Sequence, residues 1–306
     1  MITAGGKLVR KIVVILSVLF FILLVACNDE NSVPEENTSD DVEQENKDSE
    51  EDTKNEEDED EKDLDEEVPE SEENSEVVEP KYKIDENASV VPVEDGVNEN
   101  VVLLTIDDAP DKYSLEMAKK LKELEAGAIF FVNGHFIDTE EEQETLKQIH
   151  EMGFVIGNHT YNHPLLSDLE GKDDQQREEI VGLNNVIEEI IGERPAFFRA
   201  PNGVNTDYSR QLALEEEMVL MNWTYGYDYF KPYMDAEKLT TAMVTGEGPE
   251  VDVPYSLLKP GANLLMHDRE WTNDALEEIV TGLREQGYEI VDPHLIQTIS
   301  EKESVE

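Results

Sequence analysis

The chain has 306 residues, a formal net charge of −50 at pH 7 and one cysteine. This charge argues against a nucleic-acid-binding protein with a broad basic face, and one cysteine excludes an intramolecular disulfide framework and a zinc site built from several thiolates. The length allows one domain of ordinary size with extensions, or two small domains.

The first residues have the layout of an export signal. Three basic residues precede an apolar run over residues 12–26, which is shorter than the roughly 20 residues that span a bilayer. The run leads into Leu24-Val-Ala-Cys27, which resembles the lipobox of bacterial lipoproteins. The resemblance implies a signal peptide over residues 1–27, lipidation of Cys27 and a lipid-anchored protein on the outer face of the cell membrane. An uncleaved signal-anchor helix is the alternative.

A strongly acidic segment follows. Residues 28–80 contain 27 acidic residues and 3 lysines, and no aromatic residue. Such a segment has too little apolar surface to recover the entropy of ordering. We therefore expect a disordered acidic linker over residues 28–90, acting either as a tether or as a solubilising extension, and a folded domain over residues 91–300.

From about residue 95, apolar strand candidates alternate with amphipathic helix candidates. Strands without polar alternation favour a parallel sheet covered by helices. We expect an α/β fold, a distorted TIM-like (β/α) barrel of about seven strands, with an open doubly wound sheet as the alternative. The expected order is strand 101–106, helix 114–125, strand 128–132, helix 141–152, strand 154–156, helix 173–191, strand 196–198, helix 207–216, strand 218–223, helix 235–244, strand 263–266, helix 273–286 and strand 288–291.

Polar side chains follow several of these strands directly. In a parallel barrel the carboxyl ends of the strands meet on one rim, where active sites are built. The sequence therefore predicts an enzyme site formed by residues at the strand ends, namely Asp107, Asp108, His159, His163, Arg199, Asp228 and His267.

Two features of this rim suggest a metal site. His159 and His163 are four residues apart, and two histidines with one carboxylate leave open positions on Zn²⁺ for water and substrate. Asp107 and Asp108 interrupt an apolar strand, so one could bind the metal while the other takes a proton from metal-bound water. Thr160 stands where the zinc-protease pattern has glutamate, so the base must come from elsewhere. An iron oxygenase site with two histidines and one carboxylate is formally open.

Five segments resemble the ordered motifs of the NodB-homology polysaccharide deacetylases, over roughly residues 100–292. They are Thr105-Ile-Asp-Asp-Ala-Pro110, His159-Thr-Tyr-Asn-His163, Arg199-Ala-Pro-Asn-Gly203, Trp223 through Tyr229, and Leu264-Leu-Met-His-Asp268. With the N-terminal signal and acidic tether, the chain is similar to lipoprotein deacetylases of Gram-positive-type envelopes.

The resemblance implies a metal-dependent polysaccharide N-deacetylase. Asp108, His159 and His163 would bind a divalent cation, with zinc first and cobalt, nickel or manganese as alternatives. Asp107 would be the base that activates metal-bound water, and His267 the acid that protonates the departing amine. The resemblance also implies that Arg199 holds Asp107, that Asp228 orients His267, and that Pro201, Asn202, Tyr229 and Leu265 contact the substrate.

The implied partners are an acetylated glycan of the cell envelope and the membrane, with no nucleic acid and no particular oligomeric state. Three positions depart from the usual motifs, namely Ala109, Asn202 and Tyr229. Tyr229 and the nearby Tyr225, Tyr227 and Tyr233 form either a stacking surface for sugars or ordinary core. A non-catalytic wall-binding lipoprotein on the same fold and an O-acetyl esterase remain as alternative functions.

Overall fold

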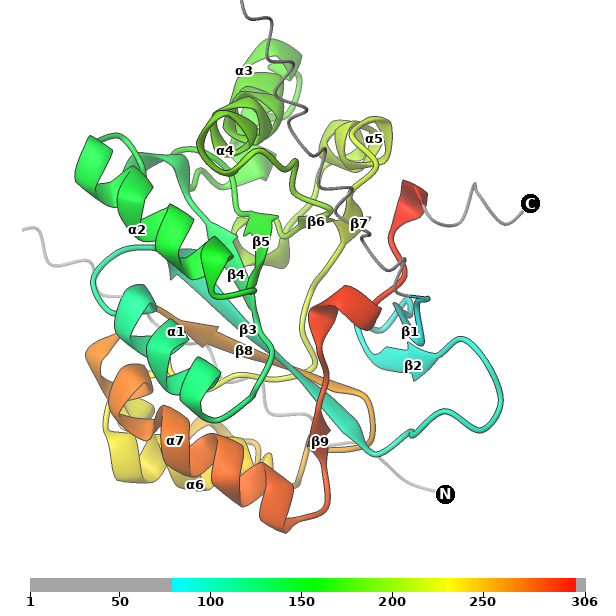
Figure 1. Cartoon of the computed structure of the whole chain (residues 1–306), viewed down its shortest axis with the longest axis vertical. Coiled ribbons are helices and arrows are strands. Elements are labelled where there is room, and N and C mark those ends of the chain that lie inside the picture. Colours follow the sequence, from blue (N-terminus) through cyan, green and yellow to red (C-terminus); the bar gives the residue numbers. More distant parts are fainter. Residues whose placement is uncertain (1–78, 301–306) are drawn as a thin grey trace, which may run out of the picture. The chain divides into compact units, whose positions relative to one another are not determined.

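The computed structural model describes residues 79–300 (Figure 1). The predicted signal peptide with Cys27, and all but the end of the predicted acidic linker, lie outside the described residues. Within the described part, no helix combines the length and the apolar character needed to cross a membrane.

A curled sheet of seven parallel strands forms the centre of the fold (Figure 1). The strand order is β7-β6-β5-β4-β3-β8, and β9 pairs with the start of β3. The strands are β3 (Val101–Ala109), β4 (Ile129–Val132), β5 (Val155–Asn158), β6 (Phe197–Phe198), β7 (Val219–Leu220), β8 (Ala262–His267) and β9 (Glu289–Ile290).

The chain that leaves β7 brings the two ends of the sheet together. The backbone N–H of Thr224 donates to Asn263 of β8, and the N–H of Leu265 donates back to Tyr225, both at 2.9 Å. Backbone pairing therefore continues from the β7 end to β8, although only through a short segment. This confirms the expected distorted barrel of about seven strands, and the open doubly wound sheet is wrong.

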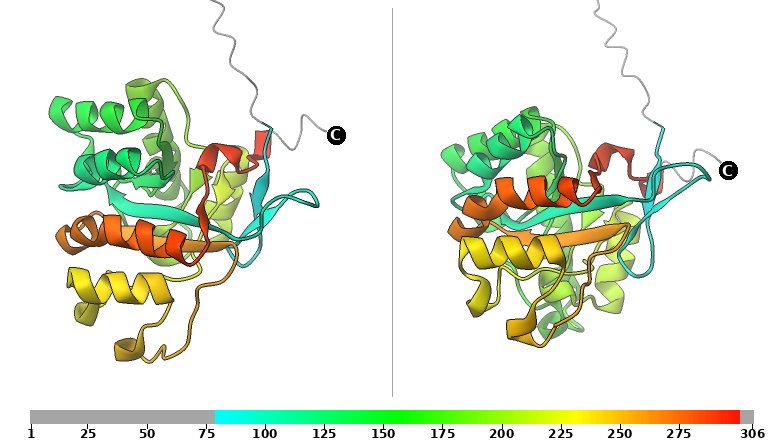
Figure 2. Two further views of the ribbon diagram at one scale, coloured as in Figure 1. Left: turned by 60° about the horizontal axis from the view of Figure 1, so that its bottom comes forward. Right: turned by 90° about the horizontal axis from the view of Figure 1, so that it is seen from below.

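Helices cover the outer face of the barrel, and α6 and α7 lie side by side (Figure 2). The expected helix at 173–191 is interrupted by a π-helical turn, η3, between α3 and α4. The helices are α1 (Ser114–Glu123), α2 (Glu140–Glu151), α3 (Asp173–Arg177), η3 (Glu178–Gly182), α4 (Leu183–Ile191), α5 (Asp207–Glu215), α6 (Ala236–Thr245) and α7 (Glu270–Glu285). Short 3₁₀ turns are η1 (Gly134–Phe136), η2 (Leu166–Leu169), η4 (Pro201–Gly203), η5 (Lys231–Tyr233), η6 (Pro249–Val251) and η7 (Pro293–Leu295).

Strand alternation separates the core into two clusters. In β3, Val102, Leu104 and Ile106 pack in the larger cluster with the helices, whereas Val101 and Leu103 pack in a second cluster with the inward side chains of other strands. Because successive strand residues point to opposite faces, the next two inward positions are Thr105 and Asp107. The barrel interior is thus apolar toward the strand starts and polar toward the strand ends.

A small hairpin, β1 (Tyr82–Ile84) with β2 (Val90–Pro92), precedes the barrel. Tyr82 is buried in the inner cluster, and its carbonyl accepts from Gln297 N–H at 2.7 Å. The folded part thus includes β1, which lies within the expected linker, and the boundary expected at residue 91 falls inside β2. The acidic composition of the stretch before the barrel made its few apolar residues hard to recognise as part of the fold. Packing of these apolar residues orders the hairpin.

Candidate active site

The end of β3 directs two adjacent carboxylates differently. Asp107 is buried and lies in register with His267 at the end of β8. Asp108 has a φ of 60°, and the β3–β4 register shifts between Ile106 and Ala109. A non-glycine residue in the left-handed region is strained, and such residues concentrate at functional sites. The irregularity separates the two neighbouring carboxylates, as their separate expected roles require.

Asp108, His159 and His163 come together at this rim, as expected, and their ligand atoms all lie within 4.8 Å of one another. Asp108 Oδ1 is 3.9 Å from His159 Nε2 and 3.7 Å from His163 Nε2. Atoms at these spacings can each approach about 2 Å from one shared cation, and two imidazoles with one carboxylate are a common zinc donor set. The three residues therefore fit a divalent cation.

His159 is fixed through its ring. Its Nδ1 donates to the carbonyl of Arg199 at 2.7 Å, which leaves the Nε2 lone pair facing the carboxylates. Burial lowers the pKa of His159 and outweighs the raising effect of Asp107 and Asp108. A neutral imidazole with a free Nε2 is the form that binds a metal ion.

Asp108 is held in the charged form. Burial by itself would raise its pKa, but the cationic His267 and Arg269, together with the nearby imidazoles of His159 and His163, lower it below the ordinary value. Arg269 Nη2 donates to Asp108 Oδ2 at 2.6 Å, so Oδ1 alone faces the two histidines. Sequence reasoning missed Arg269, and its position two residues after His267 on the same rim was the available signal.

Asp107 is paired with Arg199 as expected. Arg199 is fully buried, and its Nη1 donates to Asp107 Oδ1 at 2.6 Å and to the Thr105 hydroxyl at 2.8 Å. Its remaining donors reach the carbonyls of Met221 and Asn222. Because Oδ1 is occupied by the guanidinium, Oδ2 is the carboxylate atom on the side of the histidines, 3.5 Å from His159 Nε2.

His267 is paired with Asp228, also as expected. Its Nδ1 donates to Asp228 Oδ1 at 2.8 Å, and the side chain of Asp228 is fully buried. Burial would lower the pKa of His267, but the carboxylate of Asp228, with smaller help from Asp107 and Asp108, raises it to about 9. The ring therefore carries a proton on Nε2 at neutral pH.

Asp268 joins the two halves of the site, although sequence reasoning assigned it no role. Its buried carboxylate accepts from the backbone N–H groups of Lys112, Tyr113 and Ser114, and from the Ser114 hydroxyl at 2.6 Å. The residue after His267 thus holds the loop that follows Asp107 and Asp108. Ser114, the first residue of α1, forms no N-terminal cap of its own. The Asp268 carboxylate instead acts as the capping group of α1.

The four expected substrate residues occupy different settings. Tyr229 is 43% exposed, with its ring centroid 5.7 Å from that of His267, and Leu265 is buried in β8 two positions before His267. Pro201 is buried, whereas Asn202 is exposed in a left-handed conformation in η4. Tyr229 is thus adjacent to the expected acid. The substrate contacts of all four remain predictions.

The idea of a tyrosine stacking surface is wrong for three of the four tyrosines. Tyr225, Tyr227 and Tyr233 are buried, and the hydroxyls of Tyr225 and Tyr227 donate to the carbonyls of Met243 and Gly246. They form part of the core between the loop after β7 and α6. Only Tyr229 can offer a ring to a sugar.

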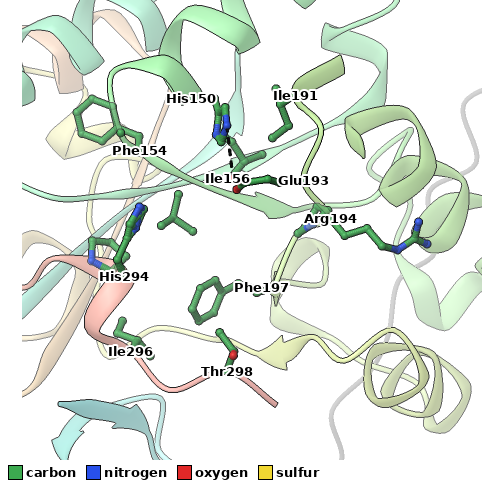
Figure 3. A pocket seen from close by; sticks show the side chains of 15 residues that line it. His150, Phe154, Ile156, Ile191, Glu193, Arg194, Phe197, His294, Ile296 and Thr298 are labelled. Atoms are coloured by element: carbon green, nitrogen blue, oxygen red, sulfur yellow. Dashed lines mark ion pairs between the residues drawn. The ribbon is translucent and has the colours of Figure 1, made fainter. Parts of the chain in front are cut away.

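A cavity of about 400 Å³ lies at the other end of the strands, where β5 and β6 begin (Figure 3). His150 and His294 line it, and His150 Nε2 is 4.0 Å from Glu193. The cavity contains none of the expected site residues, and the possible metal site found in the described part is on the opposite rim. The expected site residues therefore lie at the carboxyl ends of the strands, away from this cavity.

Comparison with known proteins gives a consistent assignment. Residues 94–220 match the polysaccharide deacetylase family. The chain is 29% identical over 198 residues to a peptidoglycan-N-acetylglucosamine deacetylase of Bacillus cereus, covering 64% of this chain and 68% of that protein. It is 27% identical over 178 residues to the peptidoglycan-N-acetylmuramic acid deacetylase PdaA of Bacillus subtilis, covering 58% of this chain and 63% of that one. Several relatives are thus longer than the shared region.

Solved structures agree on the fold. A peptidoglycan N-acetylglucosamine deacetylase in complex with a naphthyl N-hydroxybenzamide is 27% identical, with a TM-score of 0.56 and coverage of 66% of this chain and 90% of that one. A CE4 family pseudoenzyme from Bacillus anthracis is 28% identical, with a TM-score of 0.54 and coverage of 63% of each chain. Residues 94–220 are therefore similar in sequence to the polysaccharide deacetylase family, and the fold is similar to that of CE4 family structures.

Proposed function

We propose that this chain is a metal-dependent hydrolase that removes N-acetyl groups from a peptidoglycan sugar or another envelope polysaccharide. The carrying observation is that Asp107 and His267, an acceptor and a donor of protons, lie in register on adjacent strands beside the Asp108, His159 and His163 cluster. The relatives that act on acetylated peptidoglycan support this substrate class.

The three clustered residues would hold a divalent cation, with zinc the first candidate. When bound, the cation supplies a Lewis acid that polarises the acetyl carbonyl and makes an adjacent water more acidic. This matters because an amide carbonyl is a poor electrophile, so charge stabilisation in the transition state has the largest effect.

Asp107 would accept the proton of the attacking water on Oδ2. Arg199 occupies Oδ1 at 2.6 Å and so fixes which oxygen is free. Since Asp107 and Arg199 are both buried, this orientation is set before substrate arrives. Such pre-organisation avoids reorganisation during the reaction.

His267 would donate a proton from Nε2 to the departing amine nitrogen, which leaves poorly unless protonated. Asp228 keeps the ring oriented through Nδ1 and keeps it protonated through the raised pKa. The sum of these steps is hydrolysis of the amide by one water, giving acetate and a free amine on the sugar.

The N-terminal signal and Cys27 support a lipid-anchored protein on the outer face of the cell membrane, where an envelope glycan is within reach. The family match covers residues 94–220 and the site extends to His267, and the acidic segment before them would connect this part to the anchor. Incorporation of labelled fatty acid by the wild type, but not by Cys27→Ala, is the expected test result.

Acetate release tests the main proposal. The full chain loaded with zinc should free acetate from N-acetylated chito-oligosaccharides or purified peptidoglycan. Asp107→Asn should abolish release while zinc remains bound, since Asn cannot accept the proton and Asp107 is outside the metal-binding cluster. Zinc-loaded wild-type protein that frees no acetate from any N-acetylated wall polymer would contradict the proposal.

The likeness to a CE4 pseudoenzyme favours a second candidate, a wall-binding protein without turnover. A related mutant of that pseudoenzyme is described as having restored activity, so small differences on this fold decide between the two. In the present chain the cluster residues lie together, Asp107 is paired with Arg199 and His267 is paired with Asp228, which favours turnover. Binding of peptidoglycan without acetate release would support the second candidate.

A further inference from the structure

The two histidines of the metal-binding cluster are supported differently. His159 is held through its ring by the Arg199 carbonyl and is 2% exposed. The side chain of His163 is 35% exposed, and its ring forms no hydrogen bond within residues 79–300. Histidine ligands usually donate their second ring nitrogen to a partner that sets their orientation. The position of His163 must therefore depend on its backbone.

That backbone is strained. Thr160 and His163 have φ values of 68° and 54°, in the left-handed region that non-glycine residues avoid. Such conformations persist only where surrounding contacts fix them. Asn133, which directly follows β4, fixes the first part of the segment. Its Nδ2 donates to the carbonyls of His159 and Thr160. These contacts stop short of Asn162, the neighbour of His163.

The π-helical turn η3 holds the remaining part. The Glu179 carbonyl accepts from Tyr161 N–H at 2.9 Å. The Glu179 carboxylate accepts twice from Asn162, from the backbone N–H at 2.7 Å and from Nδ2 at 2.8 Å. The carbonyl of the next residue, Ile180, accepts from Asn158 Nδ2 at 2.8 Å.

The π geometry explains why these carbonyls are available. An α-helix uses each interior carbonyl for the N–H four residues later, and a π turn disturbs that pattern. The carbonyls of Glu179 and Ile180 point to the segment between Asn158 and His163 and bond it at two points. The irregular turn in an otherwise continuous helix thus faces the loop that carries both histidines.

We infer that Glu179 is a positioning residue for the metal-binding cluster, because it fixes the backbone that places His163 and takes the place of the missing ring hydrogen bond. This inference rests on the proposed metal-binding function. The role of η3 in catalysis would be indirect. Among the described residues, Glu179 contacts neither the cluster nor the expected reacting groups.

Zinc affinity of the full chain in detergent, measured by competition with a chromophoric chelator, tests the inference. Glu179→Ala should weaken zinc binding at least about tenfold, the usual cost of losing a residue that orients a ligand. Glu178→Ala is the matched control, since this glutamate precedes Glu179 in the same turn and is exposed. It should leave the affinity unchanged.

Exchanging the carboxylate and the amide between Glu179 and Asn162, which conserves the net charge in the double variant, distinguishes positioning from general stability. Glu179→Gln keeps one acceptor but turns an NH₂ group toward Asn162 Nδ2, so it should weaken zinc binding less than Glu179→Ala. Adding Asn162→Asp restores a donor and acceptor pair and should recover affinity. Ring ¹⁵N NMR with zinc should show that Glu179→Ala disturbs His163 while the His159 resonances keep their wild-type positions.

The outcomes separate the two levels of the proposal. Wild-type protein that binds no zinc would contradict the proposed metal dependence itself. Wild-type protein that binds zinc, with Glu179→Ala binding it equally well, would overturn only the role of Glu179. Equal weakening by Glu178→Ala, or no recovery in the double variant, would overturn it as well, because the effect would then come from η3 stability or charge.

Discussion

Asp228 binds His267 at two points, the ring and the backbone. Its Oδ1 accepts from His267 Nδ1 at 2.8 Å, and its Oδ2 accepts from the His267 backbone N–H at 2.6 Å. The same Oδ2 accepts from the Thr272 hydroxyl, and the Asp228 carbonyl accepts from the Trp271 indole. Residues at the start of α7 therefore hold the Asp228 carboxylate, and this carboxylate holds the His267 imidazole in one orientation. The same carboxylate raises the pKa of His267.

Asp228→Asn should lower the pKa of His267. The folded-state pKa of about 9 depends on the carboxylate charge, while burial acts in the opposite direction. Without that charge the pKa should fall by at least about one unit. Because the acid must be protonated to act, the alkaline limb of the kcat/KM profile should move to lower pH.

Ring ¹⁵N NMR titration of the metal-free chain measures this pKa directly. Wild type and variant must be compared in the same metal state, since a bound cation also lowers the pKa of a nearby imidazole. Asp252→Asn, at an exposed aspartate, is the control and should leave the titration unchanged. An unchanged His267 pKa in Asp228→Asn would mean that another group sets it.

Arg199→Met should destabilise the protein as well as inactivate it. The side chains of Arg199 and Asp107 are 0% and 3% exposed, so removing the guanidinium leaves a buried carboxylate without its charged partner. Breaking such a pair costs about 3–5 kcal/mol. Urea unfolding of the metal-free chain measures the loss, and Arg210→Met, at an exposed position, should cost little. A loss below about 1 kcal/mol in Arg199→Met would contradict the assignment of this pair.

The sequence allowed the barrel to be predicted because its strands are apolar on both faces and its helices are amphipathic. The α2 and α5 helices begin after the capping residues Thr139 and Thr206, whose side chains bond backbone N–H groups of the first turn. The hairpin at Tyr82 was missed because a short strand in an acidic context has too few residues to show a period. Its order comes from packing on Ile296 and the inner cluster, which local sequence does not reveal.

Within the site, the ordered motifs predicted residues that the structure brings together, namely the Asp108, His159 and His163 cluster, Asp107 with Arg199, and His267 with Asp228. The motifs did not point to Arg269 or Glu179, because each contacts a residue distant in sequence and neither belongs to a motif. The π turn was also hidden, since the apolar spacing of residues 173–191 fits a continuous α-helix. Contacts of this kind depend on tertiary geometry, and only the folded structure brings Glu179 to Asn162.

Removal of the cation should lower the melting temperature. A ligand present at 100 times its Kd stabilises the folded state by about 2.7 kcal/mol. For a domain of this size that corresponds to roughly 5–10 °C. Adding a chelator to zinc-loaded wild-type protein should therefore cause a clear downward shift in scanning calorimetry.

His159→Ala should melt at the same temperature with and without chelator, because it lacks one of the cluster residues. His294→Ala, which changes a histidine lining the cavity at the opposite end of the strands, should respond to the chelator as the wild type does. A full chelator response in His159→Ala would show that zinc binds elsewhere.

Gly226→Ala should separate the placement of the acid from metal binding. A Cβ at Gly226 would overlap the Leu265 carbonyl oxygen. Leu265 lies in β8 two residues before His267, so this part of β8 would have to move. Displacement of a catalytic group by about 1 Å can cost roughly 100-fold in rate. The cluster is carried by β3 and the loop after β5, so zinc affinity should be retained while kcat falls. Gly182→Ala adds a methyl with no atom closer than 4.0 Å and should leave kcat unchanged. Full activity in Gly226→Ala would mean that the reaction does not depend on the position of His267.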